Sequence, residues 1–201
     1  MCIRDRFFHT ATIEAKATEK WKTHPIGGEV RPEVWGCCHD EKSCTPKGQS
    51  FTECRDTVHA TWMMESGLFE KQPSPERKKR ALEDSRKMGY EFFVESASMV
   101  DLKDGQHNVK IVVKNTGIAP FYHSGWPIEL RDGKNQSSKP ARTKWELTKI
   151  LPDQSKTFEM KVSFDASAGF EIRVPNPMKK GKPLRFANQR QQTDGWLKIS
   201  K

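Results

Sequence analysis

The most constraining feature of this 201-residue sequence is a change in the spacing of its apolar residues near Gly89. After Gly89, apolar and polar residues alternate in short runs, which is the two-residue period of a strand that buries one face. Asp-Gly, Pro-Asp and Asn-Pro turn signals separate these runs. The predicted strands span residues 90–95, 108–114, 127–131, 143–147, 157–162, 169–174, 182–186 and 195–199. Short strands at this spacing predict an immunoglobulin-like antiparallel β-sandwich over residues 90–201.

Before Gly89 the sequence alternates between helical and strand patterns. The predicted elements are a helix over 10–21, a strand over 25–30, a short helix that Ser50 opens with Glu53 in the capping-box position, a strand over 58–63, and a helix over 75–88 that Ser74 and Pro75 open. This alternation is typical of an α/β unit with parallel strands. We therefore expect an α+β chain overall, with a domain boundary near Gly89.

The first residues do not fit either pattern. Residues 1–6 lack the apolar segment of a signal peptide and resemble translated sequencing-adapter sequence. We therefore expect residues 1–6 to be a sequencing artefact and the chain to be the C-terminal fragment of a longer protein. An export signal would then lie in the missing part.

Four cysteines lie within 18 residues: Cys37, Cys38, Cys44 and Cys54. An even, clustered set predicts disulfides formed in an oxidising compartment, and hence a secreted, periplasmic or cell-surface protein. Cys37 and Cys38 are adjacent and are not expected to pair with each other, so each is expected to bond to Cys44 or Cys54. The alternative is a zinc site that adds His39, but structural zinc ligands usually come in C-x-x-C pairs, which this spacing lacks.

The net charge of +9 comes from 35 basic and 26 acidic residues that are scattered along the chain. The dense basic run, residues 77–80, falls in a helical pattern and is interpreted as a solvated helix face, so we expect no nucleic-acid partner. No stretch is apolar enough to span a membrane. The sequence contains no phosphate loop, dinucleotide fingerprint or G-x-S-x-G motif, and we expect no cofactor and no metal.

The candidate site combines the ends of the two early strands. The first strand ends in a Gly-Gly-Glu sequence that places Glu29 beside backbone without side chains, and the second carries His59 and Trp62. If the strand ends are neighbours, a carboxylate, a titratable donor and a flat aromatic ring would share one cleft suited to a sugar. Trp35 and Glu33 are candidate outer contacts. The alternatives are a His59 satisfied by backbone and a Trp62 packed in the core.

Several segments together resemble a known family arrangement. They are residues 25–29 (Pro-Ile-Gly-Gly-Glu), 59–62 (His-Ala-Thr-Trp), 88–90 (Met-Gly-Tyr), 113–122 (Val-Lys-Asn-Thr-Gly-Ile-Ala-Pro-Phe-Tyr) and 184–188 (Leu-Arg-Phe-Ala-Asn). The chain resembles bacterial secreted proteins in which a glycoside-hydrolase-like (β/α)8 barrel precedes a β-sandwich of unknown function. The resemblance covers nearly everything after residue 7, and the Asn-Thr-Gly-Ile-Ala-Pro sequence is its most specific part.

The resemblance implies that residues 7–89 are the C-terminal fragment of a (β/α)8 barrel, with 25–30 and 58–63 as its seventh and eighth strands. Glu29 would then occupy the position of a retaining glycosidase nucleophile. The second carboxylate that such chemistry needs would come from the fourth strand, in the missing N-terminal part of the barrel. The expected function is a fragment of a secreted carbohydrate-active protein, incomplete for catalysis and with carbohydrate as its partner. The alternatives are a non-catalytic carbohydrate-binding or cell-surface scaffold module, and a free-standing interaction protein stapled by disulfides.

Overall fold

The computed structural model describes residues 13–35, 37–40, 50–67, 72–134, 137, 139–148, 150–164, 169–189 and 191–199. The chain forms two compact units, the first made of residues 1–90 and 117–122 and the second of residues 91–116 and 123–201. The sequence prediction placed residues 117–122 with the later strands, whereas they belong to the first unit. The fold is a mixture of α and β structure, and the described strands form no closed barrel.

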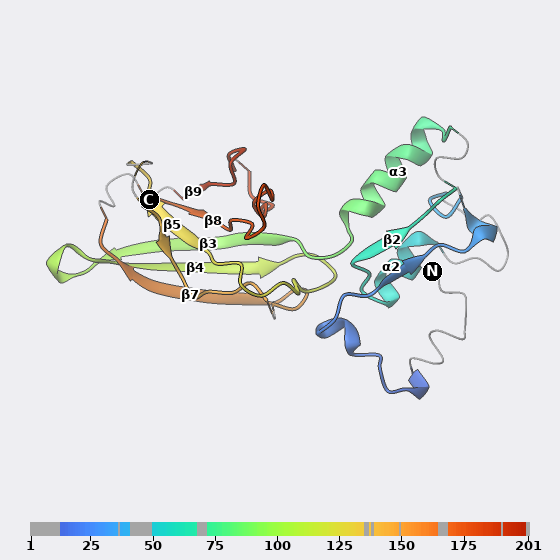
Figure 1. Ribbon diagram of the computed structural model, residues 1–201, viewed down its shortest axis with the longest axis horizontal. Coiled ribbons are helices and arrows are strands. Elements are labelled where there is room, and N and C mark those ends of the chain that lie inside the picture. The colour runs from blue at the N-terminus through green and yellow to red at the C-terminus, as the bar shows by residue number, and fades with distance from the viewer. Residues whose placement is uncertain are drawn as a thin grey trace. The chain divides into compact units, whose positions relative to one another are not determined.

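The first unit contains a pair of short parallel strands with helices around it (Figure 1). Its elements are η1 (Lys20–Lys22), β1 (Gly27–Glu29), η2 (Pro32–Val34), α2 (Phe51–Thr57), β2 (Trp62–Met64) and α3 (Pro75–Arg86). The parallel pairing of β1 with β2 confirms the prediction made from the α/β alternation.

Both helix starts that the sequence predicted are confirmed. At α2 the Ser50 hydroxyl accepts a hydrogen bond from the Glu53 backbone N–H at 3.2 Å, and the Glu53 carboxylate accepts one from the Ser50 N–H at 2.7 Å. At α3 the Ser74 hydroxyl accepts from the Arg77 N–H at 3.2 Å, with Pro75 at the first helical position. Each cap satisfies backbone donors that the first helical turn leaves without an intrahelical partner.

The predicted strand over residues 58–63 is wrong in its first four residues, because α2 ends in a turn there. The His59 N–H donates to the Asp56 carbonyl at 3.4 Å and the Ala60 N–H to the Arg55 carbonyl at 2.9 Å. These two bonds form a Schellman motif, and His59 takes the left-handed conformation (φ 52°) that usually falls to glycine. The strand therefore begins only at Trp62.

The predicted helix over residues 10–21 is also wrong in its described part. The backbone is α-helical only at Ile13 and Glu14, and Lys16 has a φ of 51°, which interrupts a right-handed helix before the short 3-10 helix η1 begins at Lys20. Ile13 is 53% exposed, so the apolar positions that suggested an amphipathic helix do not meet a core. A short helix without such packing is marginal in water.

The core of the first unit gathers around the end of β1. Five buried side chains form it, and Trp35, Cys37, Met63 and Met88 pack against them. The five are Val30, Val34, Cys38, Phe51 and Cys54.

The second unit consists of two antiparallel sheets, and β3, β4 and β7 lie side by side in Figure 1. One sheet has the order β3 (Phe92–Asp101), β4 (His107–Asn115) and β7 (Ser155–Val162), and the other the order β6 (Ala141–Arg142), β5 (Glu129–Asp132), β8 (Phe170–Arg173) and β9 (Leu197–Ile199). The turn η3 (Lys103–Gly105) lies between β3 and β4. Along β4, Val109, Ile111 and Val113 are fully buried, which is the alternation that predicted the strand.

Five of the eight predicted strands, at 108–114, 127–131, 157–162, 169–174 and 195–199, overlap β4, β5, β7, β8 and β9. The predicted strand over 90–95 covers only the beginning of β3. The predicted strand over 143–147 is wrong, because β6 ends at Arg142. The one over 182–186 reduces to a single bridge between Leu184 and Val174.

Candidate functional site

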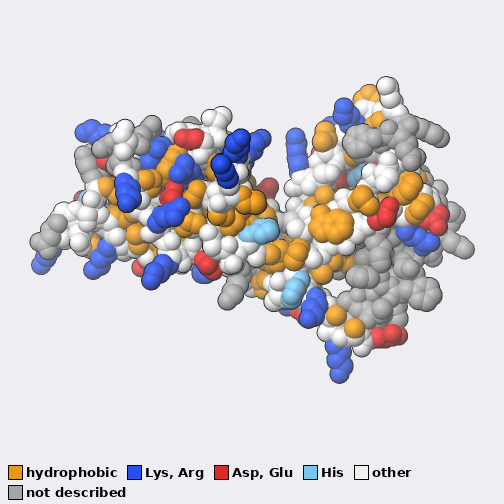
Figure 2. All heavy atoms as spheres, in the orientation of Figure 1, with side chains coloured by type: hydrophobic (Ala, Val, Ile, Leu, Met, Phe, Trp, Pro, Cys, Tyr) orange, Lys and Arg blue, Asp and Glu red, His pale blue; other side chains and the backbone are white. Residues whose placement is uncertain are grey.

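The parallel pair of β1 and β2 presents one outward face, which we call the ladder face and define by Gly27, Glu29, Trp62 and Met64. The register sets Gly27 opposite Trp62 and Glu29 opposite Met64, and residues two apart on a strand share a face. Glu29 is exposed, and Trp62 and Met64 are 53% and 51% exposed. Met63, which points the other way, packs against the core cluster. Hydrophobic side chains at the surface of the first unit are visible in Figure 2.

Gly27 is required for this face because the Trp62 indole lies over it. A Cβ atom at position 27 would be 2.5 Å from both Cδ2 and Cε2 of Trp62, and 2.3 Å from its carbonyl oxygen. The glycine thus leaves room for a flat aromatic ring. Glu29 follows two residues along the same face, and its carboxylate makes no hydrogen bond or ion pair with any described residue.

His59 does not share this face with Glu29, so the predicted three-residue cleft is wrong. In a parallel pair both strands begin at one edge of the ladder and end at the other. Glu29 ends β1, whereas His59 precedes the start of β2, beyond the Thr61 N–H that donates to the Ile26 carbonyl at 2.7 Å. His59 therefore lies at the N-terminal ends of the two paired strands, and Glu29 lies at their C-terminal ends.

His59 instead joins two segments of the first unit. Its ring stacks on Trp21 with a centroid distance of 3.6 Å, and its Nδ1 donates to the Ile118 carbonyl at 2.6 Å. The Tyr122 hydroxyl donates to the Trp21 carbonyl at 2.5 Å. Burial raises the pKa of the Tyr122 phenol, and a hydrogen bond with Thr61 opposes the rise. These contacts hold Gly117–Tyr122 in the first unit, and they favour the backbone-satisfied alternative for His59.

The two predicted outer contacts differ in their settings. The Trp35 indole N–H donates to the Val30 carbonyl at 2.6 Å and the ring packs against the core cluster, so Trp35 has a structural role. Glu33 is exposed and pairs with Arg31 at 3.2 Å. A hydrogen bond from its own backbone lowers the pKa of Glu33, and Arg31 lowers it further. A role of Glu33 in binding stays a prediction.

The prediction that all four clustered cysteines form disulfides is wrong for two of them. Cys38 and Cys54 are buried in the core cluster and are not disulfide-bonded. A cysteine thiol packs there as a small apolar side chain, so the even count was misleading. Cys37 is disulfide-bonded. Cys44 lies outside the described residues, as does Cys2.

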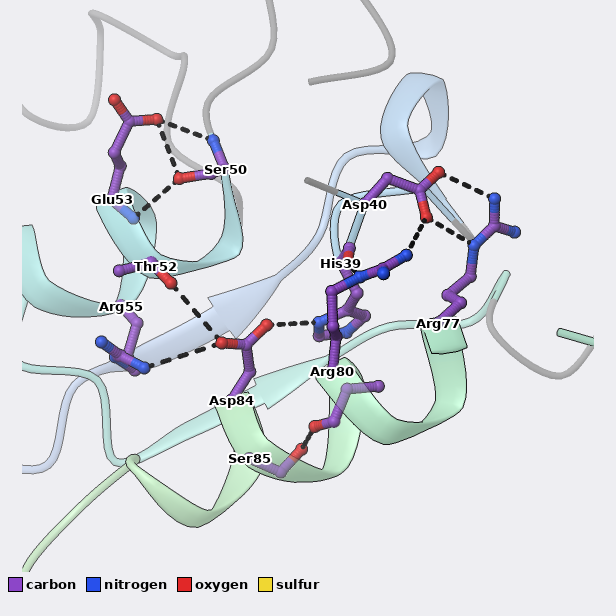
Figure 3. Close-up of polar contacts among 11 residues, drawn as sticks. His39, Asp40, Ser50, Thr52, Glu53, Arg55, Arg77, Arg80, Asp84 and Ser85 are labelled. Carbon is purple, nitrogen blue, oxygen red and sulfur yellow. Dashed lines mark hydrogen bonds and ion pairs between the residues drawn. The ribbon is translucent and has the colours of Figure 1, made fainter. Parts of the chain in front are cut away.

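A polar cluster joins the segment that carries Asp40 to α3 (Figure 3). Both carboxylate oxygens of Asp40 accept from Arg77, at 2.8 Å each, and Arg80 donates to the same carboxylate at 3.3 Å. The Arg80 Nε also donates to the His39 carbonyl at 2.6 Å. The Arg77 hydrogen bonds hold the pKa of Asp40 below its ordinary value, against the opposing effect of burial. The basic run over 77–80 is therefore half solvated and half engaged in ion pairs.

A second part of this cluster joins α2 to α3 through Asp84. The buried His39 ring contacts an Asp84 oxygen through Nδ1 at 3.0 Å, and the Thr52 hydroxyl donates to the other oxygen at 3.5 Å. The buried Arg55 side chain lies 3.9 Å from Asp84 and donates to Asp56 at 2.6 Å. These groups contact one another, which is the arrangement of a structural network.

Sequence reasoning missed this network. The available signal was the spacing of Arg77, Arg80 and Asp84, which places the three side chains on one face of α3. Their partners lie 37 to 45 residues away, and spacing alone does not identify them.

The described residues contain no group of three or more His, Cys, Asp or Glu side chains that could hold a metal ion, so the zinc alternative has no described ligand set. No helix in the described ranges is long and apolar enough to cross a membrane.

The comparisons with known proteins give little similarity. No protein-family profile matches the chain, and no curated protein matches it. Among solved structures, the chain is similar to β-glucosidase 3B from Thermotoga neapolitana in complexes with glycerol and with glucose. Each similarity has a TM-score of 0.25 and 19% sequence identity, and covers 56% of this chain and 16% of the β-glucosidase. The chain therefore spans about a sixth of that protein, and a similarity at this level does not define the fold.

Proposed function

We propose that the chain is part of a carbohydrate-active protein and that the ladder face binds a sugar. The observation that carries this proposal is the exposed Trp62 indole, which lies over Gly27 with the exposed Glu29 carboxylate on the same face. The apolar face of a sugar ring stacks on an indole. A carboxylate accepts hydrogen bonds from the hydroxyls at the edge of the same ring.

The architecture we propose for the first unit is the last part of a (β/α)8 barrel. Parallel strands occur in sheets that are covered on both faces, and two strands alone are marginally stable. The exposed ladder face supports β1 and β2 as neighbouring strands of a larger parallel sheet.

For the second unit we propose an immunoglobulin-like sandwich. Of its seven described strands in chain order, the first, second and fifth form one sheet, and the third, sixth and seventh form the other. This partition supports the proposal, because immunoglobulin-like sandwiches divide these six strands in the same way. The fourth strand, β6, differs, because it lies at the edge of the second sheet here and belongs to the first sheet in a constant-type immunoglobulin domain.

We propose binding rather than catalysis as the role of Glu29 in this chain. A retaining glycosidase needs a second carboxylate at roughly 5 Å, and His59, the other titratable group predicted for the cleft, lies at the opposite edge of the ladder. We further propose that the protein acts outside the cytoplasm, and the disulfide at Cys37 supports this compartment.

The test is to titrate the 201-residue chain with a panel of neutral and acidic disaccharides and to measure binding by calorimetry and by tryptophan fluorescence. Trp62→Ala should weaken binding by about three- to tenfold, the loss of one stacking contact. Glu29→Gln should weaken it by about tenfold or more, the loss of a charged hydrogen bond. The matched control is Glu83→Gln, an exposed acid on α3 of the same unit, which should leave the affinity unchanged. Saccharide binding that is indifferent to Trp62→Ala would exclude the ladder face as the site.

A further inference from the structure

A groove of about 570 Å³ lies between one edge of each sheet in the second unit. One wall is β3, an edge strand of the three-stranded sheet, and the other is β9, an edge strand of the four-stranded sheet. The lining residues are 93–97, 187–189 and 197–199. All of them lie in the described part of the chain, and the ladder face takes no part in this groove.

Among the described residues, only the beginning of the outer edge of β3 is covered. There the Ala187 N–H donates to the Phe92 carbonyl at 2.7 Å. The Asn188 side-chain amide then accepts from the Val94 N–H at 2.8 Å and donates to the Val94 carbonyl at 3.0 Å. An amide that bonds to both groups of one residue imitates the peptide of a neighbouring strand. Residues 187 and 188 thus occupy the place of the first two residues of an added strand. Among the described residues, this pairing ends at Val94.

Beyond this point no described strand pairs with the outer edge of β3. Residues 96–100 pair with β4 on their inner side, and their backbone makes no further hydrogen bond within the described residues. A bulge between Val94 and Ser96 separates the covered part of the edge from this stretch. Of these five consecutive residues, 96 and 97 line the groove, and 98–100 continue the same strand beyond it.

The opposite edge of the same sheet is built differently. β7 carries Lys156 and Lys161, and charged side chains of this kind keep an edge strand from pairing with other chains. β3 has no Lys, Arg or Pro in its ten residues, and Val100 is 59% exposed. The sheet thus protects one edge and leaves the other able to pair.

We infer that β3 accepts an extended segment of another protein as an added strand, through backbone hydrogen bonds to residues 96–100. Exposed acids, Glu95 and Asp101, bracket this stretch. The segment that fits has small uncharged side chains in its middle and basic side chains six residues apart, opposite these two acids. A second copy of the chain fits less well. If two β3 strands paired antiparallel around Ser98, Glu95 of each copy would lie opposite Asp101 of the other. The pairing would thus contain two pairs of like charges, which are destabilising.

The probe is the blocked heptapeptide Lys-Thr-Val-Thr-Val-Thr-Lys, added to the isotopically labelled 201-residue chain at physiological salt. Its control is the same peptide with Pro in place of the central Thr, because proline cannot complete the ladder of hydrogen bonds. We expect amide chemical-shift changes confined to residues 95–101 and 197–199 for the first peptide, and at least a tenfold weaker response to the second.

A pair of protein variants completes the test. The double variant Ser96→Lys, Ser98→Lys gives β3 lysine side chains at two exposed positions, as β7 has. It should weaken binding of the heptapeptide at least tenfold. Thr157→Lys, at an exposed position on β7, should leave it unchanged. Three results would overturn the inference: no shift at residues 95–101 up to millimolar peptide, shifts there that depend on protein concentration without peptide, or shifts in the groove produced by a saccharide and not by the peptide. The second result would identify a second copy as the occupant, and the third a glycan.

Discussion

Replacing Gly27 by alanine should force β1 and β2 apart. The added Cβ would stand 2.3 Å from the Trp62 carbonyl oxygen and 2.5 Å from two atoms of its indole. The indole can rotate away, but the carbonyl belongs to the β2 backbone and moves only with the strand. To restore an ordinary contact distance, β2 has to move by about 1 Å, which takes hydrogen bonds of ordinary length to the limit of their range.

The cost follows from the bonds that bracket the ladder. The Thr61 N–H donates to the Ile26 carbonyl at 2.7 Å, and the Val30 N–H to the Met64 carbonyl at 2.8 Å. Weakening both costs roughly 1–3 kcal/mol at a net value of about 0.5–1.5 kcal/mol each. Overpacking of the indole adds to this cost, and the smaller entropy of an unfolded chain with alanine offsets about 0.4–1 kcal/mol. We expect a net destabilisation of about 2 kcal/mol.

The assay is amide hydrogen exchange in the whole chain, together with denaturant unfolding followed by fluorescence. In Gly27→Ala the Thr61 and Val30 amides should exchange at least tenfold faster than in the original chain. The double variant with Trp62→Ala should recover only part of the loss, because the contact with the backbone carbonyl remains. Unchanged exchange of both amides, with an unfolding free energy within about 0.5 kcal/mol of the original, would refute the placement of Trp62 over Gly27.

Three further outcomes follow from the first unit. Asp40→Asn should destabilise the chain by about 1–2 kcal/mol at pH 7, because it removes a charged acceptor from Arg77. Since the pKa of Asp40 is lowered by folding, its contribution is present above about pH 4 and is lost as the pH falls through the folded pKa; unfolding free energies from pH 7 to 2 should therefore converge between the two proteins in acid. Thiol titration without reductant should find Cys38 and Cys54 unreactive in the folded protein and reactive after denaturation, and the absence of thiol in the denatured chain would contradict their assignment. His59→Ala should cost about 1–2 kcal/mol through the lost stacking and hydrogen bond, as measured by denaturant unfolding, and should leave saccharide binding at the ladder face unchanged.

The features that could be predicted from the sequence are those that neighbouring residues determine. Ser50 with Glu53, and Ser74 with Pro75, define helix starts because a cap needs only the residues of the first turn. The position of Glu29 at the end of β1 follows equally directly from a short strand that ends in Gly-Gly-Glu. Most of the later strands could be predicted because each buries one face and alternates accordingly.

The features that could not be predicted depend on a competition between two local structures or on partners that are distant in the sequence. Thr57 and Val58 have high strand propensity, yet a helix that begins with a full capping box continues through Thr57, and His59 then takes a conformation that sequence patterns reserve for glycine. The cysteine count could not separate buried thiols from disulfide partners, because both occur in clustered, apolar surroundings. The pairing of Asp40 with Arg77 could not be predicted, because 37 residues separate the two in the sequence.

The membership of Gly117–Tyr122 in the first unit has a consequence for synthesis on the ribosome. The chain leaves the first unit after Tyr90, builds β3 and β4 of the second, and only then supplies a segment whose Ile118 and Ala119 amides both bond to the Gly89 carbonyl. Because translation proceeds from the N-terminus, the first unit lacks this segment until Tyr122 has emerged. Its completion and the start of the second unit therefore overlap in time, and a ribosome that stalls between residues 91 and 116 would present a nascent first unit without the partner for His59 and Trp21.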